Sequence, residues 1–143
     1  MSPTPRNDYS YNQDVIENFR AHNGNLENRP LLLLTTTGAK SGKTRVIPLA
    51  YSRDGDRYIV LASKGGAPTN PDWYHNVVAH PEVTVEVGGS QFRARASVAH
   101  GEEHERMFNS HATAMPNFAE YQEKTSRKIP VIILEVSRTA SAD

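Results

Sequence analysis

The sequence predicts a mainly β protein with peripheral helices, in which six strands form a small closed or split barrel. Three observations indicate this class: six short segments rich in β-branched and aromatic residues, tight-turn signals between several of them, and helical periodicity confined to the remaining segments. A small antiparallel sheet avoids exposed edges by closing on itself. The chain has 143 residues, which is enough for one domain with a real core and too few for two.

The strands are predicted from apolar or alternating runs bounded by turn residues. They are expected at residues 31–37, 45–51, 57–63, 82–87, 91–98 and 131–136. Asp54-Gly55-Asp56 marks a turn before the third strand, and Gly88-Gly89 is a two-residue link of the kind that tight hairpins use. Apolar residues occupy both faces of the third strand, so we expect it to be central in the sheet.

The helices are predicted at the ends of the barrel. They are expected at residues 12–22, 73–80, 102–114 and, after a break at Pro116, up to about 124. Asn23-Gly24-Asn25 is typical of the end of the first helix, and Asp72 is positioned to cap the second. Residues 12–137 then form the single domain, with polar tails at residues 1–11 and 138–143 that we expect to be disordered.

Composition excludes several classes of function. Lys and Arg total 16 and so do Asp and Glu, so the net charge is zero and no long-range attraction to nucleic acid is expected. Cysteine is absent, which excludes disulfides and thiol chemistry. The polar N-terminal residues match neither a secretion signal nor a membrane span, so we expect a cytoplasmic protein with no transmembrane segment. Peripheral contact with the inner face of the plasma membrane stays open.

A basic loop between the first two strands is the sharpest local feature. Residues 38–45 contain three cations, two hydroxyls and two glycines, which could turn backbone N–H groups inward around an anion. The loop predicts a phosphate cradle. A solvated hairpin tip explains the same composition through turn chemistry alone. A P-loop is excluded because three residues, not four, separate Gly38 from Gly42 and because a strand follows the loop.

A second loop strengthens the hypothesis of an anion site. Ser63-Lys64-Gly65-Gly66 follows the central strand, adds a fourth cation, and precedes a helix that begins near Trp73. Glycine-rich amides and a helix start suit anionic oxygens, while an indole offers an apolar wall for a planar ring. The competing interpretation makes Trp73 or Tyr74 a core residue beneath the barrel mouth.

Together these segments resemble the deazaflavin-dependent nitroreductase family of actinobacteria. The resemblance lies in residues 36–45, 48–49, 62–66, 70–76 and 129–131, and it extends from about Leu31 to Glu135. It implies a split β-barrel, coenzyme F-420 (8-hydroxy-5-deazaflavin) as cofactor, and a two-electron reduction of a small-molecule acceptor such as a quinone, an enone or a nitro-aromatic compound.

The resemblance also implies roles for individual residues. Lys40, Ser41, Lys43 and Arg45 would hold the phosphate and the acidic glutamyl tail of the cofactor. Ser63, Lys64, Gly65 and Gly66 would line the deazaflavin and its phosphate side, with Asn70, Trp73 and Asn76 supporting the pocket. Gly38, Gly42, Thr44, Pro48 and Ala62 complete the expected cofactor-binding set.

The acceptor side departs from the family pattern. Met115, Phe118 and Tyr121 stand where the family has a tyrosine-rich stretch over the substrate, and Ala50 stands where nitroreducing members can carry a tyrosine. We expect the first three to form a substrate wall, although apolar residues at helical spacing also indicate core packing. Ser63 and Tyr121 are the candidate donors for negative charge that develops on the acceptor.

A metal site is not expected. His100-Gly101-Glu102-Glu103-His104 fits the H-x-x-E-H pattern of a zinc peptidase, in which both histidines share one helical face. Here the first histidine is predicted to precede the helix, so the pair would not share a face.

Two other functions fit the same residues. One is a deazaflavin carrier without turnover, which would keep the basic loops and lack an acceptor pocket. The other is a split-barrel reductase that uses flavin mononucleotide. Four cations on two loops favour a longer and more acidic ligand. The sequence leaves the oligomeric state undetermined, and a dimer is compatible with it.

Overall fold

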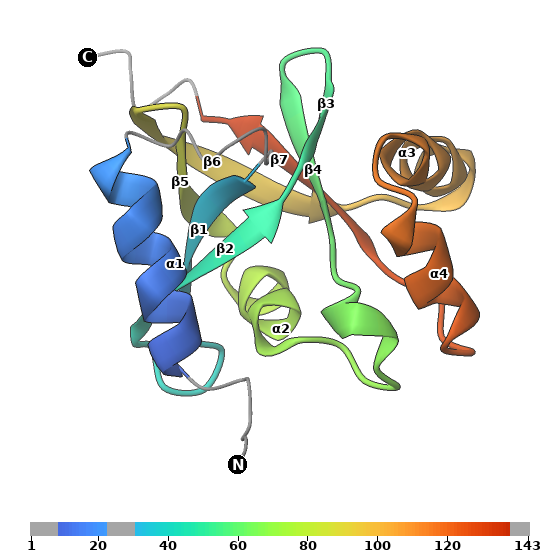
Figure 1. Cartoon of the computed structure of the whole chain (residues 1–143), viewed down its shortest axis with the longest axis horizontal. Coiled ribbons are helices and arrows are strands. Elements are labelled where there is room, and N and C mark those ends of the chain that lie inside the picture. The colour runs from blue at the N-terminus through green and yellow to red at the C-terminus, as the bar shows by residue number, and fades with distance from the viewer. Residues whose placement is uncertain (1–8, 23–30, 138–143) are drawn as a thin grey trace.

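The computed structural model describes residues 9–22 and 31–137. In these residues a curled β-sheet carries helices on its faces and at one end (Figure 1). The elements are α1 (Tyr9–Ala21), β1 (Leu31–Thr37), β2 (Thr44–Ala50), β3 (Ser52–Asp54), β4 (Arg57–Leu61), the 3₁₀ turn η1 (Lys64–Gly66), α2 (Asp72–Ala79), β5 (Glu82–Val87), β6 (Ser90–Val98), α3 (Gly101–Ala114), α4 (Asn117–Glu123) and β7 (Val131–Val136).

The described part of the chain contains seven strands, so the prediction of six is wrong. Their order across the sheet is β2-β1-β5-β6-β7-β4-β3, with antiparallel pairing throughout. The extra strand, β3, pairs Ser52 with Ile59 and Asp54 with Arg57. Its three residues have no β-propensity signal. They pair with β4 because the turn at residues 55–56 folds them back onto it.

The sheet curls because its two outer strands are consecutive in the chain. Tyr51 alone separates β2, at one edge, from β3, at the other. The sheet must therefore bend until both edges meet at this residue. The strand predicted at 45–51 corresponds to β2, which pairs with β1 over residues 44–50, and the strand predicted at 57–63 ends at Leu61.

The other predicted elements agree with the structure to within a few residues. Helix α1 begins at Tyr9 rather than at the predicted residue 12. Pro71 lies at the N-cap of α2 and Asp72 makes no side-chain cap, so the predicted cap is wrong. The N-terminal tail predicted at 1–11 is wrong for residues 9–11, which belong to α1. Residues 1–8 of that tail, the predicted helix end at 23–25 and the predicted tail at 138–143 lie outside the described residues. No helix in the two described ranges is long and apolar enough to cross a bilayer.

Both faces of the sheet are covered, which explains the continuous apolar runs of β1 and β7. On the concave face, Leu32 and Leu34 pack with the α2 residues Trp73 and Val77. On the opposite face, Leu31 and Leu33 pack against α1, while β4 and β7 pack against α3 and α4.

Strand direction brings the two predicted ligand loops to one rim of the sheet. Because each neighbouring pair is antiparallel, β1 and β4, four places apart in the sheet, run the same way. The loop after β1 and the turn η1 after β4 therefore leave the sheet at the same end. Helix α2 lies at this end, and α4 lies beside η1 (Figure 1).

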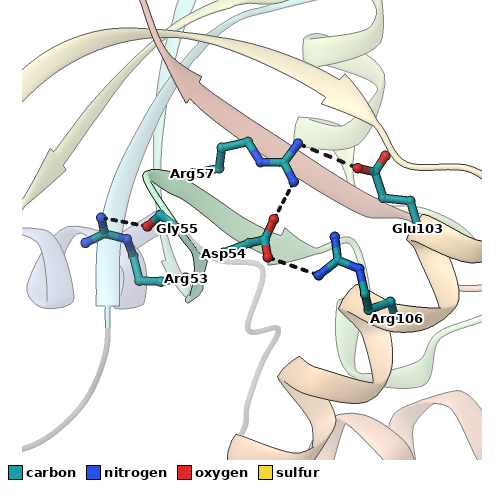
Figure 2. A network of polar contacts seen from close by, with 6 residues as sticks. All are labelled: Arg53, Asp54, Gly55, Arg57, Glu103 and Arg106. Carbon is teal, nitrogen blue, oxygen red and sulfur yellow. Dashed lines mark hydrogen bonds and ion pairs between the residues drawn. The ribbon is translucent and has the colours of Figure 1, made fainter.

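An ionic network braces the other end of β4. Asp54 accepts hydrogen bonds from Arg57 and, at 3.0 Å, from Arg106 on α3, while Arg57 lies 3.6 Å from Glu103 (Figure 2). These hydrogen bonds, that from Arg106 first, lower the pKa of Asp54. The network ties the β3–β4 hairpin to α3 at the end of β4 remote from η1.

Candidate functional site

The first ligand loop, residues 38–43, is a tight hairpin held by its own backbone. The Gly38 N–H donates to the Lys43 carbonyl at 2.8 Å, and the Gly42 N–H donates to the Gly38 carbonyl at 2.9 Å. Gly42 has a φ of 73°, which glycine adopts without strain. The Lys43 N–H is also occupied, because it donates to Ser41 Oγ at 3.1 Å.

Asn76 fixes this loop from helix α2. Its Oδ1 accepts the Ala39 N–H at 2.9 Å, and its Nδ2 donates to Thr36 Oγ1 at 3.2 Å. Asn76 is buried, so these bonds are protected from water. The predicted inward turn of the loop amides is therefore wrong for Gly38, Ala39, Gly42 and Lys43, whose N–H groups already have partners within the protein.

The side chains of the loop remain available to an anion. Lys40, Ser41, Lys43, Thr44 and Arg45 are all exposed. Within residues 9–22 and 31–137, none of the three cations lies in an ion pair. The loop thus presents three uncompensated positive charges on a fixed backbone.

The second ligand loop is the turn η1 with the residues before it. Ser63 is buried at 7% exposure, and its hydroxyl has no hydrogen-bond partner among the described residues. Lys64 has a φ of 48°, a strained value for a residue with a side chain. Its exposed ammonium makes one long contact, 3.4 Å to Thr69 Oγ1. Gly65 completes the turn.

Helix α4 packs directly on the η1 turn. Gly66 is buried with a φ of 85°, and a Cβ on it would lie 2.8 Å from the Tyr121 carbonyl oxygen and 2.9 Å from Lys124 Cβ. Only glycine allows this close approach. The predicted acceptor helix and the predicted cofactor turn are therefore in contact.

Arg127, which sequence reasoning missed, holds the chain on both sides of η1. Its guanidinium donates to the carbonyls of Ala62, Ser63 and Ala67 and to Asn70 Oδ1. Burial lowers the pKa of Arg127 below its ordinary value. The sequence carried no signal for this residue, because a lone arginine before a strand is common on protein surfaces.

The remaining predicted cofactor residues lie deeper. Trp73 is 5% exposed and belongs to the concave core, so it is the core residue of the pair Trp73 and Tyr74. Ala62 is fully buried, and Pro48 is half-buried on β2 opposite Leu33. Trp73 thus serves the core, and neither Ala62 nor Pro48 has a polar side-chain group that could bind a ligand.

The three predicted acceptor residues differ in exposure. Phe118 is 8% exposed and packs with Ile59 and Leu61, and its ring meets that of His111 edge to face at 4.5 Å. Met115 and Tyr121 are half-buried at the margin of the same cluster. The phenol oxygen of Tyr121 accepts a hydrogen bond from Asn117 at 3.1 Å.

The histidines of α3 serve packing. His100 precedes the helix, whereas His104 Nε2 lies 2.8 Å from the Ile129 carbonyl, so the two do not share a face. His111 is fully buried, with Nδ1 2.8 Å from Ser52 Oγ, and burial lowers its pKa to about 4. Within the described ranges, no three His, Cys, Asp or Glu side chains converge as a metal site would require.

Comparison with known proteins gives one consistent result. The family described as F420H(2)-dependent quinone reductase matches residues 10–136. A protein named F420H(2)-dependent quinone reductase, from Mycobacterium tuberculosis strain H37Rv, is 41% identical over 124 residues, which cover 81% of this chain and 83% of the relative.

Two solved structures share the fold at high identity. One, described as an F420-H2 dependent reductase (FDR-A), has a TM-score of 0.70 and 46% identity, covering 78% of this chain and 98% of that one. The other, described as a domain-swapped dimer, has a TM-score of 0.72 and 39% identity, covering 89% of this chain and 98% of that one.

Proposed function

Because this chain belongs to the F420H(2)-dependent quinone reductase family, we propose that it moves a hydride from reduced coenzyme F-420 to a quinone at the rim formed by the two ligand loops. The observation that carries this proposal is the presence of four cations on those loops, none of them paired with a carboxylate in the described part of the chain. A phosphate with an acidic tail would supply the missing negative charge.

The residues present fit an F-420 molecule. Lys40, Lys43 and Arg45 would hold its acidic tail, because their backbone is fixed by Asn76 while their side chains are free to adapt. Lys64 would meet the phosphate from the second loop. When bound, the cofactor supplies the hydride. Every other contribution comes from the protein: charge neutralisation, a fixed backbone, and the packing of α4 on the η1 turn.

Two hydroxyl groups would meet the charge that develops on the acceptor oxygen. The Ser63 hydroxyl is unengaged among the described residues, so its proton is available. The Tyr121 oxygen accepts from Asn117, which orients the phenol and leaves its own O–H free to donate outward. Met115, half-buried nearby, would add an apolar contact to a flat acceptor.

A quinone suits this arrangement better than a nitro group. The acceptor side offers one phenol, one thioether and a buried ring, and so few donors for the two charge-rich oxygens of a nitro group. The quinone oxygen needs one donor at a time. We accordingly propose quinones first, then enones, with nitro-aromatic compounds as weaker substrates.

We extend the proposal to the barrel, the oligomeric state and the location of the protein. We propose that the curled sheet is the half-barrel of a split β-barrel, as strands β2 and β3 bring its edges together. A similar structure described as a domain-swapped dimer supports a dimer here. We also propose a cytoplasmic site of action with peripheral contact at the inner face of the plasma membrane, where quinones dissolve.

Turnover with matched tyrosine variants tests the proposal. The protein should oxidise reduced F-420 when a small naphthoquinone is added, and NADPH should not replace the cofactor. Tyr121→Phe should lower turnover with unchanged F-420 affinity, because it removes only the donor. Tyr58→Phe, on the far half of β4, is the control. Binding of F-420 without turnover of any acceptor would favour the carrier, and preferential binding of flavin mononucleotide would favour the flavin reductase.

A further inference from the structure

The side chain of Arg127 donates four hydrogen bonds, and all of them go to the segment 62–70. Nε lies 2.9 Å from the Ala67 carbonyl, and Nη2 lies 2.8 Å from the Ser63 carbonyl. Nη1 reaches both Asn70 Oδ1, at 2.6 Å, and the Ala62 carbonyl, at 3.2 Å. The four acceptors lie before, after and beyond the η1 turn, so one guanidinium spans residues 62–70.

Besides Arg127, two contacts in the described part of the chain restrain this segment from outside: the Ala62 N–H donates to the Pro130 carbonyl at 3.0 Å, and α4 packs on Gly66. The segment's own backbone supplies two short-range bonds, from Gly66 to Ser63 at 2.9 Å and from Ala67 to Lys64 at 3.1 Å. Lys64 meanwhile keeps a strained positive φ. A segment with such a conformation persists only when its surroundings over-determine it. The planar guanidinium of Arg127, with its four hydrogen bonds, supplies these surroundings.

The acceptors are neutral, which distinguishes Arg127 from Arg57, the other half-buried arginine among the described residues. Arg57 bonds to carboxylates. Arg127 bonds only to carbonyl and amide oxygens, and no carboxylate pairs with it within residues 9–22 and 31–137. Its role is therefore geometric: each N–H satisfies one oxygen of a loop that must hold its shape.

Helix α4 aims Arg127 at the loop. Gln122 Nε2 donates to the Arg127 carbonyl at 2.7 Å, and Gln122 Oε1 accepts the Ile129 N–H at 3.0 Å. One side chain thus clamps the backbone on both sides of residue 128. The helix that carries Tyr121 fixes Arg127, and Arg127 fixes the loop that carries Ser63 and Lys64.

We propose that Arg127 is a positioning residue for F-420: it preorganises residues 62–70, so that the Ser63 hydroxyl and the Lys64 ammonium already stand where the cofactor needs them. This inference rests on the proposed function. Arg127 itself touches no part of the cofactor. Preorganisation raises affinity because the ordering of the loop is complete before binding.

Arg127→Lys tests this proposal, because lysine keeps the positive charge and lacks the planar guanidinium. An ammonium has three donors on one atom and cannot span four acceptors. We expect the dissociation constant of F-420, from fluorescence titration, to rise about ten- to a hundredfold, with the salt dependence of binding unchanged because the four surface cations remain. Hydrogen exchange in the cofactor-free variant should accelerate at the Gly66 and Ala67 amides.

Arg57→Lys is the matched control. It weakens the network in Figure 2 at the remote end of β4 and should lower the melting temperature with F-420 affinity within twofold. Equal losses of affinity in the two variants would show a general stability effect and overturn the inference, as would unchanged affinity in Arg127→Lys. A shallower salt dependence in Arg127→Lys would indicate direct contact with the phosphate and also overturn it.

Substitution of Asn70 provides a second test that does not depend on folding of the Arg127 variant. Asn70→Asp keeps an oxygen that accepts from Arg127, so hydrogen exchange at the Gly66 and Ala67 amides of the cofactor-free protein should stay as in the parent, whereas Asn70→Leu should accelerate it. Equal exchange rates in the two variants, whether both fast or both unchanged, would overturn the relay through Arg127. If the parent protein itself binds no F-420, the proposed function fails, and not this inference alone.

Discussion

Gly66 is the point where the cofactor turn meets helix α4, and its replacement by alanine tests that contact. A left-handed backbone costs a residue with a Cβ about 1–2 kcal/mol, and Gly66 has a φ of 85°. The added methyl would also lie 2.8 Å from the Tyr121 carbonyl oxygen. A backbone atom cannot rotate away, so α4 must shift, which adds about 1–3 kcal/mol of overpacking.

Gly42→Ala separates the two costs. Gly42 has a φ of 73°, but a Cβ there meets no heavy atom within 4 Å. Gly42→Ala should therefore lose only about 1–2 kcal/mol, and Gly66→Ala about 2–5 kcal/mol in all. Denaturant unfolding of both variants at one pH measures the difference. Equal losses would refute the packing of α4 on the turn.

Three further predictions address the core, the buried histidine and the charged loop. Phe118→Ala should cost about 3–5 kcal/mol in denaturant unfolding, and a stable variant with altered quinone kinetics would instead make Phe118 part of the acceptor wall. Burial lowers the folded-state pKa of His111 to about 4, so neutral His111 contributes to the free energy of unfolding fully above its unfolded pKa of about 6.5. This stability is lost as the pH falls towards about 4, by roughly 3 kcal/mol. His111→Gln should reduce the slope of unfolding free energy against pH in this range by about one proton. Lys43→Glu should weaken F-420 binding and reduce its salt dependence, whereas Arg93→Glu, the same charge change on β6, should leave both unchanged.

The sequence predicted most strands because their signals are local. Runs such as Leu31 to Leu34 are apolar on consecutive residues, and the structure explains this by covering both faces of β1. Strand β3 could not be found in this way. Its Ser-Arg-Asp sequence pairs with β4 because the turn at residues 55–56 folds it back, and the sequence signals that turn but not the short strand before it.

The ligand loops were found by composition, whereas the residues that shape them were not. Lys40, Lys43 and Lys64 are exposed cations beside glycines, a local pattern visible in the sequence. Arg127 acts on residues 62–70, some 60 positions earlier in the chain, through hydrogen bonds to backbone oxygens that any sequence possesses. Only the three-dimensional arrangement reveals such contacts.

The exposure of the late helix could not be predicted from periodicity. Met115, Phe118 and Tyr121 are spaced by three, which predicts one stripe but not which residue lies at its centre. The structure puts Phe118 against Ile59 and Leu61 and leaves the other two at the margin. The depth of each depends on how α4 packs on the rest of the protein, and periodicity carries no information about that packing.

Anaerobic single-turnover kinetics tests the central claim most directly. The protein is loaded with reduced F-420, either unlabelled or deuterated at the hydride-donating carbon, and mixed with a naphthoquinone while the absorbance of the oxidised cofactor is followed. Hydride transfer at this site predicts that the quinone accelerates oxidation above the rate without protein, and that deuteration slows the accelerated phase. Oxidation at the protein-free rate, with no effect of deuterium, would contradict the assignment of this protein as an F-420-dependent quinone reductase.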